Sequence, residues 1–137
     1  MVHAVLLRQR SVLEESISWT RGALARTLTG QGVHPLSHDA WRWSLSGALA
    51  RALFDALGPT PARSDWERLY DLAQARLRSA IPEGHPWTGA GSSDLDGFND
   101  YPGTYHEDVL DLIDRALESE MHTLLAGPLA PSTAIFN

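Results

Sequence analysis

The sequence predicts an all-α protein, a compact bundle of about four helices with a long ordered loop between the third and the fourth. Apolar residues recur every three or four positions in four segments, which is the spacing of amphipathic helices. Strand-like alternation of apolar and polar residues is absent, and 137 residues is the length of one domain. We expect residues 1–120 to form that domain, and residues 121–137 to be an apolar tail that packs on it or on a partner.

The first two helices are expected at about residues 4–18 and 39–57. The second has the clearest apolar stripe, and a Gly-Pro pair ends it at 58–59. Gly47 lies inside this helix, where glycine costs about 1 kcal/mol relative to alanine. We therefore expect another backbone, or a ligand, to approach that turn closely. The segment between the two helices, residues 19–37, is rich in glycine and predicts either a short helix at 23–28 or a small hairpin across 29–32.

The third and fourth helices each begin with a predicted capping box. Ser64 with Glu67 opens the third, and Thr104 with Glu107 opens the fourth. In this motif each side chain accepts a hydrogen bond from the other residue's backbone N–H. The third helix ends before Pro82, and the fourth runs to about Glu120. Three tryptophans are expected at core positions of the fold: Trp19, Trp41 and Trp66.

Residues 83–103 form the predicted loop, and a loop of that length in a compact domain is typically functional or disordered. Its aromatic content favours an ordered loop. The Asp94–Asp100 stretch resembles a calcium loop, but its glycine and distal glutamate fall at the wrong offsets. We expect a structural turn in which Asn99 and Asp100 bind their own backbone. No metal or cofactor is predicted, although His34 and His38, with Asp39, leave part of a metal site as an alternative to solvated side chains.

The candidate site draws on this loop and its flanks. His106 lies in the first turn of the fourth helix, where the helix dipole favours neutral imidazole. A neutral histidine near Asp100 is a candidate general base, so Asp100 and His106 are the predicted catalytic residues. Large aromatic and amide side chains around them are typical of a ligand pocket. The predicted ligand contacts are Trp43, Trp87, Phe98, Asn99 and Tyr101.

Composition excludes several classes of chemistry. The chain has no cysteine, which excludes disulfides and thiolate catalysis. All eleven basic residues are arginine, which excludes a lysine Schiff base and, together with the many Ala, Leu and Gly residues, indicates a high-GC bacterial or phage genome. A net charge of −6 argues against nucleic-acid binding. Residues 1–63 nevertheless carry seven arginines against four acids, a net charge of +3. Neither a membrane span nor a signal peptide is recognisable, so a cytoplasmic protein is expected.

Four short motifs carry a family resemblance. They are Trp19-Thr-Arg-Gly-Ala23, Trp43-Ser-Leu-Ser-Gly-Ala48, Phe98-Asn-Asp100 and the helix Glu107–Ala116. The chain resembles a domain-of-unknown-function family of small bacterial and phage proteins. Ser44 stands where that pattern has cysteine, so a role that rests on the thiol does not carry over. The resemblance implies a compact helical domain and no particular activity.

Three functions follow from these features. The first is a small-molecule-binding domain that uses the candidate site, with acid–base chemistry of a cyclase, isomerase or hydrolase type. The alternative is a protein-interaction module, an adaptor or inhibitor, whose acidic helix from Glu107 to Glu120 steers it to a basic partner and whose tail anchors it. The third is a homodimer held by that tail.

Overall fold

The computed structural model describes residues 1–85 and 95–126, with the backbone alone for 120 and 122–126. Four long helices are present, which confirms the predicted number with shifted ends: α1 (Val2–Val12), α2 (Leu45–Leu57), α3 (Arg63–Ala80) and α5 (His106–Ala126). A short 3-10 helix, η1 (Ser16–Ser18), follows α1. A short α4 (Leu95–Asp100) lies within the predicted loop.

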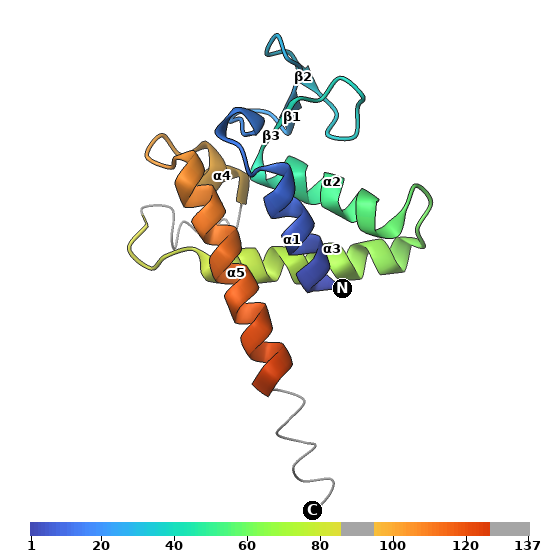
Figure 1. Ribbon diagram of the computed structural model, residues 1–137, viewed down its shortest axis with the longest axis vertical. Coiled ribbons are helices and arrows are strands. Elements are labelled where there is room, and N and C mark those ends of the chain that lie inside the picture. Colours follow the sequence, from blue (N-terminus) through green and yellow to red (C-terminus); the bar gives the residue numbers. More distant parts are fainter. Residues whose placement is uncertain (86–94, 127–137) are drawn as a thin grey trace, which may run out of the picture.

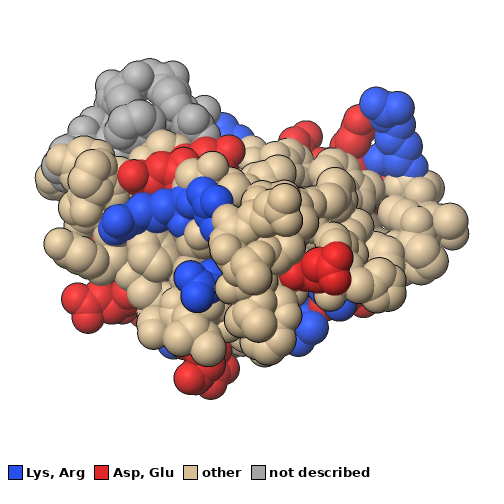
Figure 2. All heavy atoms as spheres, turned by 90° about the horizontal axis from the view of Figure 1, so that it is seen from above, with Lys and Arg blue, Asp and Glu red and all other residues tan. Residues whose placement is uncertain are grey.

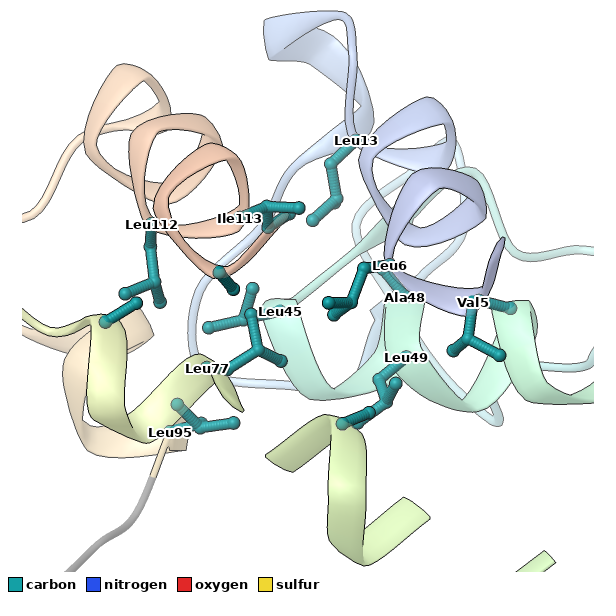
Figure 3. Packing of buried hydrophobic residues seen from close by; sticks show 14 of the residues in the cluster. Val5, Leu6, Leu13, Leu45, Ala48, Leu49, Leu77, Leu95, Leu112 and Ile113 are labelled. Carbon is teal, nitrogen blue, oxygen red and sulfur yellow. The ribbon is translucent and has the colours of Figure 1, made fainter. Parts of the chain in front are cut away.

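The long helices enclose one apolar core. α1 packs mainly on α2 and α5, and α3 crosses behind them and packs on α5 (Figure 1). Figure 3 shows apolar side chains converging from all four helices, with Leu6 of α1 directed between Leu45 and Leu49 of α2. Leu95 and Phe98 bring α4 into the same cluster. This core fixes the positions of the helix ends that carry the polar contacts described below.

A small antiparallel sheet corrects the all-α prediction. Its strands are β1 (Ala25–Arg26), β2 (Gly32–Val33) and β3 (Arg42–Trp43), in the order β2-β1-β3. Ala25 pairs with Val33 on one side and with Trp43 on the other. The hairpin alternative for residues 29–32 is confirmed. Strands of two residues are too short for an alternating pattern, which is why the sequence did not predict them.

The position of Trp41 is a second correction. The second helix begins at Leu45, because Ser44 caps it with its side chain. Trp41 therefore lies beside a strand and is 53% exposed, whereas the sequence predicted a core position. Trp19 and Trp66 are partly buried against the core, in agreement with the prediction.

The two predicted capping boxes also differ from the structure. α3 begins at Arg63, so Ser64 is already helical, and its N-cap Ala62 makes no side-chain bond. At the start of α5, the bond forms between Tyr105 and Asp108, each one residue after the predicted pair of Thr104 and Glu107. The backbone N–H of Tyr105 donates to Oδ2 of Asp108 at 2.8 Å, and Glu107 does not take this role.

Figure 2 shows the end of the molecule that carries the sheet; most of the surface in this view belongs to residues other than Lys, Arg, Asp and Glu, and basic and acidic side chains lie beside one another in places. Exposed apolar side chains in this region include Leu24, Leu28 and Trp41. Within the described ranges, no helix is both long and apolar enough to cross a bilayer.

Candidate functional site

Asn99 of α4 is the centre of a buried polar network. Its Oδ1 accepts hydrogen bonds from Nε1 of Trp19 at 2.7 Å and from the backbone N–H of Leu45 at 3.0 Å. Its Nδ2 donates to the carbonyl of Thr20 at 3.0 Å and to Oδ1 of Asp100 at 2.9 Å. An asparagine side chain has two donors and two acceptor lone pairs, and all four are used here. Asn99 thereby satisfies one of the unpaired N–H groups at the start of α2.

Asp100 adds a further bond between α4 and the segment Trp19–Ala23. Its Oδ1 also accepts a hydrogen bond from the backbone N–H of Gly22 at 2.9 Å. Gly22 has a φ of +77°, a conformation that glycine adopts without strain. Asn99 and Asp100 were expected to bond with their own backbone in a turn. They bind residues about eighty positions away instead, because α4 presents them to the strand-side segment.

The start of α2 is held against the segment before β1. Oγ of Ser44 accepts a hydrogen bond from the N–H of Gly47 at 3.0 Å, which caps the helix. A Cβ at Gly47 would lie 1.8 Å from the carbonyl oxygen of Leu24. The expected close approach at Gly47 is thus confirmed, and the approaching group is backbone. Ser44 is the N-cap of α2.

His106 contacts the C-terminal end of α1. Its Nε2 lies 2.6 Å from the carbonyl oxygen of Leu13, and because a carbonyl can only accept, Nε2 carries the proton. Its ring centroid is 6.2 Å from that of Trp19. Among the described residues no hydrogen bond joins His106 to Asp100, and each is anchored to a different segment.

Arg21 joins the Trp19–Ala23 motif to the start of α5. Its guanidinium lies 5.0 Å from the Trp19 ring centroid and 5.8 Å from that of Tyr105. It also donates to the carbonyl oxygens of Thr104 and Pro102. A cation between two aromatic faces gains from both ring quadrupoles. This clamp could not be predicted from the sequence, since no local pattern relates Arg21 to Tyr105.

The remaining predicted contacts lie in separate places. Phe98 is buried in the core at 1% exposure. Tyr101 packs edge-on against His85 with ring centroids 5.4 Å apart, and Nε2 of His85 bonds Oγ1 of Thr104 at 3.1 Å. Trp87 lies outside the described residues.

The described cavities do not unite the predicted residues in one pocket. Asp100 and Asp96 line a cavity of about 180 Å³ beside Gly22 and Ser44. Phe98 borders another of about 320 Å³. Trp43 lines a larger groove of about 570 Å³ between α1, α2 and the segment before β3. We call this the Trp43 groove; its lining residues are Arg8, Ser11, Val12, Leu36, Ser37, His38, Ala40, Trp43, Arg51 and Phe54.

Trp43 is held in place within the groove. Its Nε1 donates to the carbonyl of Pro35 at 2.9 Å, and its backbone pairs with Ala25 of β1. Of the groove's lining residues, only Trp43 was predicted from the sequence as a ligand contact. Arg8, Arg51 and Phe54 were not predicted, although the positive charge of residues 1–63 was a signal for the two arginines.

Of the two histidines considered for a metal site, His38 lines this groove. Nδ1 of His34 accepts a hydrogen bond from the N–H of Leu36 at 3.1 Å, and Oγ of Ser37 accepts one from the N–H of Asp39 at 3.1 Å. Within residues 1–85 and 95–126, no three histidine or acidic side chains are grouped to hold a metal ion.

Fold and contacts define a small, mainly helical domain in which a polar network around Asn99 joins α4, the start of α2 and the segment after η1. The chain belongs to a family of unknown function, DUF6197, which it matches over residues 1–119. This confirms the resemblance to a family without an assigned activity. No curated protein and no solved structure matches the chain. Three of the residues on which the resemblance rested, Trp19, Asn99 and Asp100, are joined to one another and to Gly22 by hydrogen bonds.

Proposed function

We propose that this protein binds a small molecule in the Trp43 groove. The observation that carries the proposal is the groove itself: a cavity of about 570 Å³ with Trp43 and Phe54 among polar and charged side chains. Ligand sites are typically concavities of roughly 300 to 1,000 Å³ with apolar walls and a few polar groups. Two of the walls are the packed helices α1 and α2, which position side chains more rigidly than loops do.

The acid–base role of Asp100 and His106 is a separate proposal. Neither residue lines the Trp43 groove, and both are bonded to backbone groups. Binding in the groove therefore needs no contribution from either side chain.

A fragment screen followed by the Trp43 indole N–H resonance tests the binding proposal. Trp43→Phe identifies that resonance among the five tryptophans. We expect some fragments to shift it in the native protein. Ser11→Tyr, which places a ring at an exposed lining position of α1, should abolish the shifts. Ser64→Tyr makes the same change at an exposed position on α3 and should preserve them.

Two results would overturn the proposal. One is a screen in which no fragment perturbs the Trp43 resonance. The other is binding that survives Ser11→Tyr unchanged, because the ligand would then occupy another place. Thermal unfolding of both variants verifies that they fold.

A second candidate function, self-association, is favoured by the shape of α5. Among the α5 side chains that the structure describes, the last buried one is Ala116, yet the helix continues to Ala126 and projects past the other helices (Figure 1). An isolated helical extension is marginally stable in water. Leu117, Met121 and Leu124 recur at helical spacing along it, and Met121 is 41% exposed.

Sedimentation equilibrium tests this second candidate. A dimer that becomes monomeric in Met121→Glu would support pairing through α5. A monomer at all accessible concentrations would contradict it and would leave the adaptor alternative, in which another protein covers the helix.

A further inference from the structure

The charges that line the Trp43 groove are of one sign. Arg8 of α1 and Arg51 of α2 line it, together with the titratable His38, and no acidic residue is among the lining residues. The cavity next to Phe98 differs, since Asp108, Asp111, Asp114 and Glu118 line it with a single arginine. In a protein with a net charge of −6, the groove is therefore a local basic site.

The carboxylate of Asp55 forms ion pairs with both arginines of the groove. Nε of Arg8 lies 2.6 Å from Oδ2 of Asp55, and Nε of Arg51 lies 3.6 Å from Oδ1 of the same residue. Two guanidinium groups and one carboxylate leave an excess charge of +1. Both arginines use Nε in their ion pairs with Asp55. The terminal nitrogens of Arg8 and Arg51, Nη1 and Nη2, form no hydrogen bond with another described residue. These terminal nitrogens are donors that can bind two oxygens of a carboxylate or a phosphate at once.

Flat apolar groups stand beside these cations. The guanidinium of Arg51 lies 5.9 Å from the ring centroid of Phe54, and Trp43 is fixed by its bond to Pro35. Val12 and Leu36 add aliphatic surface to the same lining. An aromatic or otherwise flat ligand body can pack on these side chains while its charged end faces the arginines.

We propose, building on the small-molecule function above, that the Trp43 groove takes an anionic ligand whose carboxylate or phosphate binds Arg8 and Arg51 and whose flat apolar body packs on Trp43 and Phe54. Neutralising the excess positive charge next to an apolar wall favours such a ligand over a neutral one of the same shape.

Benzoate, phenyl phosphate and neutral benzamide are the probes that test this inference, titrated against the Trp43 indole N–H resonance. We expect both anions to bind more tightly than benzamide. Arg8→Gln and Arg51→Gln should each weaken the anions about tenfold, as expected for loss of a charged hydrogen bond. Benzamide should change by no more than about twofold, because it is neutral and forms no ion pair with either arginine.

Two further variants sharpen the test. Arg68→Gln removes the same charge from an exposed position on α3 that pairs with Asp65, so it should leave anion affinity unchanged. Asp55→Asn removes the competing carboxylate and should tighten anion binding, an effect opposite in sign to that of the arginine variants. The ratio of benzoate to phenyl phosphate affinity distinguishes a carboxylate site from a phosphate site.

Anions that bind no better than benzamide would overturn the inference. So would equal weakening of all three probes by the arginine variants, or anion binding that is insensitive to both. In each case fragments that still shift Trp43 would leave the small-molecule function standing. If the fragment screen also fails, the proposed function fails with the inference.

Discussion

Nε1 of Trp19 donates a 2.7 Å hydrogen bond to Oδ1 of Asn99, a residue eighty positions later in the chain. The same oxygen accepts the backbone N–H of Leu45 at the start of α2. A single amide side chain thus joins the segment after η1, the start of α2 and the short helix α4. Trp19 and Asn99, two of the residues that the sequence singled out, therefore belong to one structural joint.

Asn99→Ala is expected to destabilise the fold by about 3 kcal/mol or more. The substitution leaves two donors, the indole N–H and the backbone N–H of Leu45, without their partner, and each buried unsatisfied donor costs roughly 1 to 3 kcal/mol. Chemical denaturation measures the change in free energy of unfolding. Glu67→Ala, which removes an exposed i,i+4 ion pair with Arg63, serves as the control and should cost less than about 1 kcal/mol. Equal effects of the two changes would argue against a joint at Asn99.

Gly47→Ala is expected to destabilise the protein although alanine is the better helix former by about 1 kcal/mol. The new Cβ would stand 1.8 Å from the Leu24 carbonyl oxygen, so α2 and the segment before β1 must separate. Gly84→Ala is a matched control, since a Cβ at that position would have no atom of another residue within 4 Å beyond its chain neighbours. Differential scanning calorimetry of the two variants should show a lower melting temperature only for Gly47→Ala. Unchanged melting of that variant would show that the close contact relaxes without cost.

Asp100→Asn separates a structural role of this residue from a catalytic one. The amide oxygen can still accept the N–H of Gly22, so we expect a change in stability below about 1 kcal/mol, the net worth of a typical hydrogen bond. Binding of fragments in the Trp43 groove should be unaffected, because Asp100 lines a different cavity. Should a reaction be found, its loss in this folded variant would support Asp100 as a general base, and full retention would contradict that role.

Tyr70 should make the protein less stable at alkaline pH. Burial raises the pKa of its phenol above the ordinary value, the charge of Asp96 raises this pKa further, and Arg78 lowers it. The unfolded chain then loses the proton first, at about pH 10. The stabilisation is complete below that pH and is lost as the pH rises through the folded pKa. Tyr70→Phe should show a smaller fall in the free energy of unfolding above about pH 10, and an identical fall in both proteins would contradict this assignment.

Sequence patterns relate residues that are a few positions apart, so they could not predict the distant partners of the site residues. The sequence singled out Asn99, Asp100 and His106 as unusual polar residues near a helix start, and each does make specific contacts. Their partners, Trp19, Gly22 and Leu13, lie about eighty to ninety positions away. A turn was expected at Asn99 because a sequence pattern shows the bonds that a residue can make with its near neighbours and not those with distant segments.

The four long helices were determined by the sequence alone, because the spacing of apolar residues at three and four positions is a local property that survives in any packing. The glycine at 47 likewise indicated a close approach without identifying its partner. Only the tertiary structure decided that residues 25–26 pair with 32–33 and 42–43, since strands of two residues carry no periodic signal. It also brought Arg8, Arg51 and Trp43 to one groove, because that neighbourhood exists only when α1 and α2 pack together and β3 sets the tryptophan beside them.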